Sequence, residues 1–112
     1  AGSGSFFRDG EYIPLFKVTP IYPRRAQERG IMGYAIVSFT ITETGTVENP
    51  EALEGMCGDP TDPATVFRPC SIFNSAAARS AVKLKYKPKI VDGKAVRVDN
   101  VPHKFTFILE ES

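Results

Sequence analysis

Residues 33–42 constrain the fold of this chain most, because their side chains alternate strictly between an apolar face and a mixed face. The apolar face consists of Ala35, Val37, Phe39 and Ile41. A period of two is typical of a β-strand with one buried side. The following turn contains Gly45, which can adopt a positive φ, so 34–48 is predicted to be a hairpin. Such a hairpin must bury its apolar face against another element.

Two helices are predicted to provide that cover. The first is short and runs from Pro23, which suits the first turn of a helix, to Gly30, which suits its end. The second spans 71–85 and carries one continuous apolar stripe, formed by Phe73, Ala77, Ala81 and Leu84. Small alanine side chains on this helix allow it to lie close to a sheet.

The C-terminal part of the chain is predicted to add a further strand. After a turn at Asp92 and Gly93, residues 95–109 are expected to be extended. One face of this segment carries Val101, His103, Phe105, Phe107 and Leu109, and the other carries Lys104, Thr106 and Ile108. The sequence therefore predicts an α+β domain, with two helices packed on one face of a three-stranded antiparallel sheet.

Residues 49–70 are predicted to form a loop, because four prolines interrupt any long element there. This stretch also holds the two cysteines of the chain, Cys57 and Cys70. A disulfide between them would stabilise the domain by about 3 kcal/mol. It would also indicate an oxidising compartment such as the bacterial periplasm. The alternative is a pair of unrelated thiols.

Composition excludes several classes of protein. The net charge of +1 argues against a nucleic-acid partner, which would favour a strong basic excess. No apolar run approaches the roughly 20 residues of a membrane helix, and no secretory signal is present. Residues 1–5 suggest a cloning remnant or cut linker, and 1–17 as a whole are expected to be an extension outside the folded domain. Any anchor would then lie upstream.

A series of motifs resembles the C-terminal domain of TonB proteins over about residues 18–110. The motifs are Pro20-x-Tyr22-Pro23-x-x-Ala26, Gly30-x-x-Gly33, the alternating strand, Gly45-x-Val47, the alanine-rich helix, Tyr86-x-Pro88 and Gly93. The resemblance implies two helices on a three-stranded sheet. It also implies that 49–70, longer than in the best-known members, is a Cys-containing insertion in a domain spanning 18–112.

The resemblance further implies a role in energy transduction rather than catalysis. Members carry energy from the inner-membrane proton gradient to outer-membrane transporters of substrates such as iron-siderophores. ExbB- and ExbD-type proteins drive an N-terminal inner-membrane anchor, and the periplasmic C-terminal domain catches a short transporter segment, the TonB box. We therefore expect a periplasmic binding module whose anchor lies outside this sequence.

Strand addition to an open sheet edge is the binding mode expected from physics. The last strand is the preferred edge, because Pro102 suits an edge and Lys104 suits its protection. The resemblance implies the same strand and the segment around Tyr22, with arginines that could meet acidic residues beside the box. The expected partner-binding residues are Ile21, Tyr22, Pro23, Arg24, Arg25, Gln27, His103, Lys104, Phe105, Thr106, Phe107 and Ile108.

Several of these residues also admit other interpretations. Tyr22 and Pro23 could simply fix the start of the first helix, and Phe105 and Phe107 favour the core over a ligand surface. A thiol enzyme using His103 would lack a third, orienting group. No catalytic residue, metal site or cofactor is expected, because no common motif is present and the loop offers a mixed set of soft and hard ligands, Cys57, Asp59, Asp62 and Cys70.

The same sequence is compatible with other roles. The domain could instead serve in a sensor or a TolA-type envelope tether, and a free edge could also pair with a second copy to give a homodimer. The lysines at 83, 85, 87 and 89 favour a solvated face, with an anionic partner as the alternative.

Overall fold

The computed structural model describes residues 12–110 of the chain. The elements, in chain order, are α1 (Arg24–Arg29), β1 (Gly33–Ile41), β2 (Val47–Cys57), β3 (Arg68–Pro69), α2 (Asn74–Ala81), β4 (Lys89–Val91), β5 (Lys94–Val96) and β6 (Val98–Phe107). The expected cloning remnant at 1–5 lies outside the described residues.

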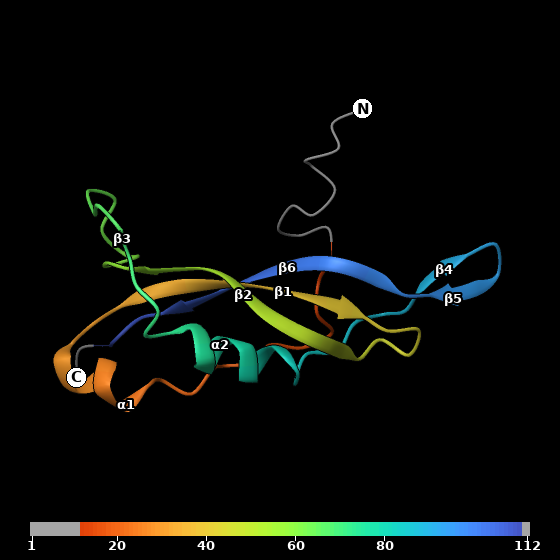
Figure 1. The fold of residues 1–112 in the computed structure, drawn as a ribbon, viewed down its shortest axis with the longest axis horizontal. Coiled ribbons are helices and arrows are strands. Elements are labelled where there is room, and N and C mark those ends of the chain that lie inside the picture. Colours follow the sequence, from red (N-terminus) through yellow and green to blue (C-terminus); the bar gives the residue numbers. More distant parts are fainter. Residues whose placement is uncertain (1–11, 111–112) are drawn as a thin grey trace.

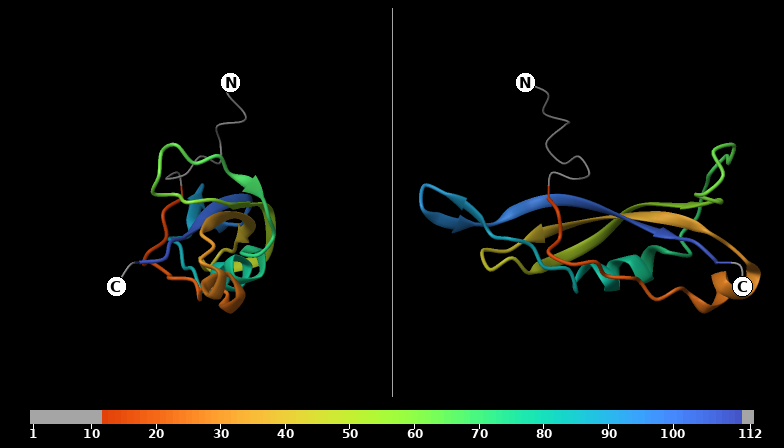
Figure 2. Two further views of the ribbon diagram at one scale, coloured as in Figure 1. Left: turned by 90° about the vertical axis from the view of Figure 1, so that its left-hand side faces the viewer. Right: turned by 180° about the vertical axis from the view of Figure 1, so that it is seen from behind.

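One antiparallel sheet with the strand order β3-β2-β1-β6 forms the centre of the molecule, and both helices lie on one of its faces (Figures 1 and 2). The prediction of an α+β fold with two covering helices is confirmed. The prediction of three strands was wrong by one, because the two-residue strand β3 pairs with the end of β2. A separate two-stranded hairpin, β4–β5, extends beyond the sheet (Figure 1).

Strand β2 is longer than the sequence indicated. The prediction that 49–70 is all loop was wrong, because β2 continues to Cys57. The ladder tolerates Pro50 through a bulge, in which Asn49 and Pro50 together face Phe39 of β1. Asn49 adopts a positive φ of 55°, which asparagine accepts more readily than most residues. A proline inside a bulge removes no regular ladder bond, so the strand survives it.

Helix α1 has the boundaries that its sequence predicts. Pro23 is its N-cap, and Gly30 ends it in the left-handed conformation, with a φ of 69°. The Gly30 N–H donates to the carbonyl oxygens of Ala26 and Gln27, so the helix end is hydrogen-bonded.

Helix α2 is shorter than the predicted span 71–85. After Ala81 the chain tightens, because the Lys83 N–H donates to the Ser80 carbonyl and the Leu84 N–H to the Ala81 carbonyl. Such i to i−3 bonds replace the α-helical pattern in a final turn. The predicted apolar stripe is nevertheless buried along its whole length, including Leu84 beyond the helix end.

The core lies between α2 and the apolar faces of β1 and β6. The alternating face predicted for β1 is buried from Ala35 to Ile41. Phe73, just before α2, stacks on Phe107 of β6 with ring centroids 4.4 Å apart. Burial raises the pKa of Tyr86, at the other end of the core, to about 12. None of the helices in residues 12–110 is long and apolar enough to cross a bilayer.

The turn at Gly45 fixes the hairpin end of the sheet against the chain that leaves α2. The Tyr86 N–H donates to the Gly45 carbonyl at 2.8 Å, and a Cβ on Gly45 would lie 2.0 Å from the Tyr86 carbonyl oxygen. Gly93, in the β4–β5 turn, has a similar positive φ, but a Cβ there would meet no atom within 4 Å. A side chain at Gly93 would therefore cause backbone strain alone, whereas a side chain at Gly45 would cause both strain and a steric clash.

We expect Gly45→Ala to lower the free energy of unfolding by more than about 3 kcal/mol, since strain of about 1–2 kcal/mol adds to a backbone clash. Gly93→Ala, the matched control, should cost only the strain. Urea denaturation of both variants measures the difference. Equal losses in the two variants would contradict the structural role assigned to Gly45.

Candidate functional site

The outer edge of β6 is the candidate functional site. β6 pairs with β1 on one side, and the strand order places it at the end of the sheet. At the opposite end, β3 covers only the last two residues of β2. The edge preferred from the sequence is therefore an edge of the folded sheet.

A hydrogen bond between β2 and the residue after β3 establishes which way the backbone groups of the sheet point. The Cys70 N–H donates to the Gly55 carbonyl at 3.0 Å, so Gly55 faces away from β1. Backbone groups alternate sides along an antiparallel strand, so the neighbouring Met56 faces β1. Its partner there is Tyr34. The backbone groups of Tyr34 consequently bond to β2. Those of the next residue, Ala35, therefore bond to β6 on the other side of the central strand.

Between residues 102 and 106 of β6, the same alternation leaves three residues with outward-facing backbone groups. Ala35 pairs with Phe105, so Phe105 bonds inward and its neighbours Lys104 and Thr106 point outward. Pro102 is two residues before Lys104 and also points outward, so its missing N–H takes nothing from the β1–β6 ladder. Residues 102–106 thus offer two N–H groups and three carbonyl oxygens to an added strand.

The side chains of β6 divide as predicted. Phe105 and Phe107 are buried in the core, which confirms the core interpretation of these two rings. His103 is partly buried, with its ring edge-on to that of Phe105 at 4.7 Å. Lys104, Thr106 and Ile108 are exposed. Phe105 and Phe107, although expected to contact a partner, therefore offer it little side-chain surface.

A groove of about 690 Å³ runs beside this edge, between residues 13–20 and residues 103–106 of β6, with Leu84 also lining it. The 13–20 segment is attached by a backbone bond from the Leu15 N–H to the Lys85 carbonyl at 2.8 Å. Among residues 12–110, no backbone bond outside the regular ladders reaches Lys104 or Thr106. The segment is therefore a second wall of the groove.

The chemistry of the groove is apolar with a cationic rim. Ile13 and Leu15 keep 71% and 63% of their surfaces exposed along the wall segment. Lys17 and Lys104 both line the groove, and no described lining residue is acidic. The Lys104 ammonium lies 4.4 Å from the centre of the Tyr34 ring, over its face. Sequence reasoning missed this wall, although the apolar residues at 13–18 were its signal.

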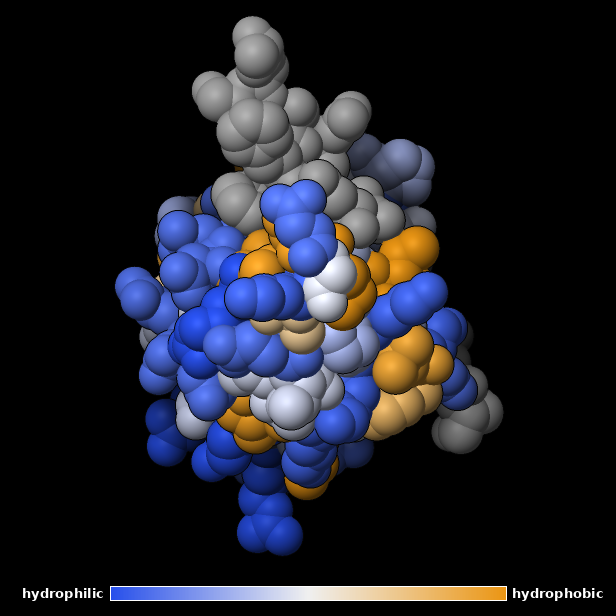
Figure 3. All heavy atoms as spheres, turned by 90° about the vertical axis from the view of Figure 1, so that its right-hand side faces the viewer, coloured by the Kyte–Doolittle hydropathy of each residue, from blue (hydrophilic) through white to orange (hydrophobic). Residues whose placement is uncertain are grey.

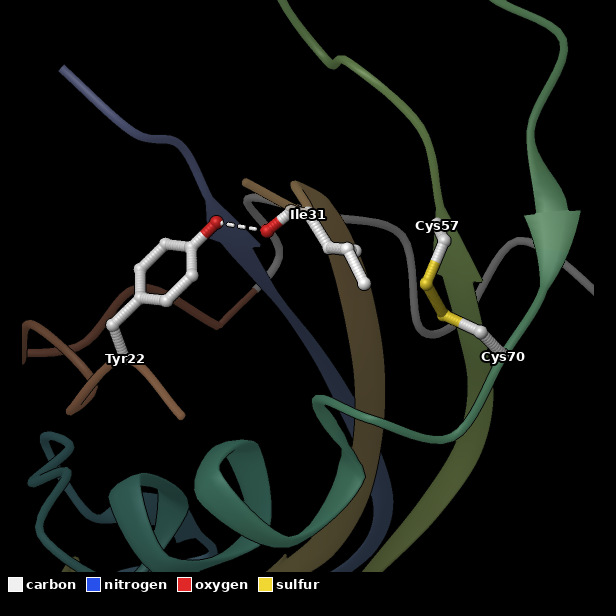
Figure 4. Close-up of a disulfide and its surroundings, with 4 residues drawn as sticks. All are labelled: Tyr22, Ile31, Cys57 and Cys70. Atoms are coloured by element: carbon white, nitrogen blue, oxygen red, sulfur yellow. Dashed lines mark hydrogen bonds between the residues drawn. A yellow bond between two sulfur atoms is a disulfide. The ribbon is translucent and has the colours of Figure 1, made fainter. Parts of the chain in front are cut away.

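Tyr22 is a structural residue at one end of this edge. Its ring lies edge-on to both Phe73 and Phe107, with centroid distances of 5.8 and 5.7 Å, and its hydroxyl donates to the Ile31 carbonyl (Figure 4). Burial raises the pKa of Tyr22 above its ordinary value. These contacts support the interpretation that Tyr22 and Pro23 fix the start of α1.

The other residues expected near Tyr22 are available on the surface. Ile21, Arg24, Arg25 and Gln27 are exposed. Because Tyr22 touches Phe107, this cationic start of α1 lies near the end of β6, as Figure 1 also shows. The structure thus places the predicted contact residues of α1 beside the C-terminal end of β6, while His103 and Lys104 lie opposite the middle of β1.

The predicted disulfide between Cys57 and Cys70 is present (Figure 4). It closes a loop that rises from the sheet on the face opposite the helices (Figure 2). Asp59 accepts hydrogen bonds from the side chain and the backbone of Thr61, which lower its pKa. Both thiols are used by the bond. Within the described part of the chain no three His, Cys, Asp or Glu residues gather as a metal site would need.

Comparisons with known proteins agree on one family. The family model described as "Gram-negative bacterial TonB protein C-terminal" matches residues 18–109. The chain is 33% identical over 94 residues to "Protein TonB" of Pseudomonas aeruginosa, covering 84% of this chain and 24% of that protein. It therefore spans about a quarter of the length of that curated relative.

Two solved structures are similar throughout. The solution NMR structure of the Pseudomonas aeruginosa TonB CTD matches with a TM-score of 0.62 and 30% identity, covering 94% of this chain and 93% of that one. The tonb2 protein of Vibrio anguillarum matches with a TM-score of 0.55 and 31% identity, covering 88% of this chain and 82% of that one.

The disulfide should stabilise the fold, although neither of its cysteines belongs to β6. We expect Cys57→Ser combined with Cys70→Ser to lower the free energy of unfolding by about 3 kcal/mol, because the open loop regains conformational freedom when unfolded. Urea denaturation measures this loss. Wild-type protein under reducing conditions is the control and should match the variant. An unchanged denaturation midpoint in both would show that the bond contributes nothing.

Proposed function

The chain belongs to the family of Gram-negative bacterial TonB C-terminal domains, and on that premise we propose that it binds an extended segment of an outer-membrane transporter along β6. The segment adds to the sheet as a further strand. The observation that carries this proposal is the row of outward-facing backbone groups at Pro102, Lys104 and Thr106, beside an apolar groove.

The magnitudes favour a grip that is firm but reversible. Five backbone bonds at about 1 kcal/mol each supply roughly 5 kcal/mol of the about 8 kcal/mol in a micromolar complex. The apolar wall formed by Ile13, Leu15 and Phe16 can supply the rest, since about 120 Å² of buried apolar surface contributes about 3 kcal/mol. Ordering costs reduce both contributions, so the affinity stays in the range of a link that must release.

Backbone recognition also suits a bond that carries force. A pull along the strands loads all the added hydrogen bonds together, so none has to hold the whole force. The β6 ladder to β1 lies in the same sheet and bears that load in the same direction. The force would originate at the inner membrane, from ExbB- and ExbD-type partners acting on an upstream anchor. The domain would work in the periplasm, serving transporters of substrates such as iron-siderophores.

The cationic start of α1 gives the proposed site its charge preference. Arg24 and Arg25 are exposed and form no ion pair with any residue that the structure describes. A transporter segment lying on β6 would bring its end near them. We propose that acidic residues beside the TonB box meet this pair, with Gln27 as a polar neighbour.

Replacing Thr106 with proline tests strand addition directly. Thr106→Pro removes one outward N–H and leaves the inward ladder intact, so we expect the melting temperature to change little. Affinity for a transporter N-terminal peptide should fall at least fivefold, measured by calorimetry. Thr106→Ala keeps the N–H and is the matched control. Equal affinity of the proline variant and this control would contradict binding at this edge.

Charge reversal tests the arginines separately. We expect Arg25→Glu to weaken binding of a peptide with acidic flanks several-fold at low salt, and the difference should shrink as salt screens it. Arg29→Glu makes the same charge change at the far end of α1 and should have a smaller effect. A variant with Glu at 25 that binds as tightly as wild type at low salt would disprove the contact.

A further inference from the structure

The β4–β5 hairpin stands apart from the rest of the fold. Its strands pair only with each other, so it forms a second sheet of its own. It lies at one end of the longest axis of the molecule, beyond the main sheet (Figure 1). The molecule measures 50 × 30 × 22 Å, so the hairpin is a projecting tip. An isolated two-stranded hairpin is marginally stable in water, which raises the question of what it contacts.

The hairpin exposes aliphatic side chains on both of its faces. Ile90 pairs with Ala95 on one face, and the neighbouring Val91 points to the other. Ile90 is 59% exposed and Val91 is 44% exposed. A folded partner resting on one face would leave the other face in water. Ile90 and Val91 can be buried together only in surroundings that enclose the hairpin on both faces.

Lysines lie within the hairpin and in the segment that leads into it. The four are Lys85, Lys87, Lys89 and Lys94, and all are exposed. None lies within ion-pair distance of a carboxylate in residues 12–110. The nearby Arg97 is already paired with Glu43 and Glu48, at 3.8 and 3.0 Å. Figure 3, which faces this end, shows blue hydrophilic side chains with orange hydrophobic ones between them.

We propose that the β4–β5 hairpin docks into the interface of a bilayer that contains anionic phospholipids. A lipid interface is fluid, so it can close around both faces of the tip and bury Ile90 and Val91 together. Lysine side chains extend their ammonium groups to the headgroups while their stems stay in apolar surroundings. Each lysine near an anionic surface strengthens binding about fivefold, and salt weakens this contribution.

This surface is separate from the β6 edge. The outward backbone groups at Lys104 and Thr106 lie several residues beyond the start of β6, which follows the hairpin. Docking of the hairpin would hold the domain at a membrane while the edge stays open. The inference therefore does not depend on the proposed peptide binding, and each can fail alone.

An introduced tryptophan tests insertion of the tip. The chain has no tryptophan, so Ile90→Trp provides a single reporter in the whole protein. With vesicles of mixed phosphatidylcholine and phosphatidylglycerol, we expect its emission to shift to the blue and its quenching by acrylamide to fall. Val66→Trp, in the exposed disulfide loop, is the matched control and should show neither change. The absence of both changes at position 90 would overturn the proposal.

Removing lysine charges from the otherwise wild-type protein tests whether these lysines contribute to vesicle binding. Lys89→Gln with Lys94→Gln should lower partitioning into the same vesicles about 30-fold in a sedimentation assay. The control, Arg29→Gln with Arg68→Gln, removes the same charge from exposed positions at the opposite end. Equal losses in both variants would indicate unspecific attraction and refute a hairpin site. Lysine-dependent binding of a polyglutamate peptide without a tryptophan shift on vesicles would also refute it, in favour of an acidic protein partner.

Discussion

Burial of the apolar face of β1 is the interaction on which the rest of this structure depends. β1 is the central strand, paired with β2 on one side and β6 on the other, so neither of its edges is open. Its inward side chains from Ala35 to Ile41 are closed off by α2, whose small side chains allow close approach. Phe73 and Phe107, stacked at 4.4 Å, continue this contact to the last strand.

A sheet built around one central strand leaves the candidate functional surface at its margin. β6 receives all its regular pairing from β1, and its outer groups at Lys104 and Thr106 face the groove beside residues 13–20. Tyr22 joins this margin to α1, because its ring touches the core on both Phe73 and Phe107. The rigid part of the fold thus positions a backbone surface, and the neighbouring arginines and lysines give it charge.

Much of this was predictable from the strand period of two residues and the helical spacing of about four residues. The β1 strand, the α1 boundaries, the buried stripe of α2 and the disulfide follow from alternation, Pro and Gly positions, and paired loop cysteines. The errors have local causes. Pro50 suggested a break, but a bulge absorbed it, and α2 tightened after Ala81 although its apolar stripe continued. The short strand β3 pairs with β2 beside the disulfide and carries no pattern of its own.

The sequence by itself determined which faces are apolar, where the chain turns and which strand suits an edge, because these depend on side-chain type and local backbone preference. Only the tertiary structure decided that the backbone N–H and C=O groups of Lys104 and Thr106 point away from β1, since the alternation of hydrogen bonds depends on the register between strands. Tertiary structure also placed residues 13–20 along β6 and left β4–β5 projecting from the body. Contacts between distant segments depend on how the whole chain packs, and no local pattern encodes them.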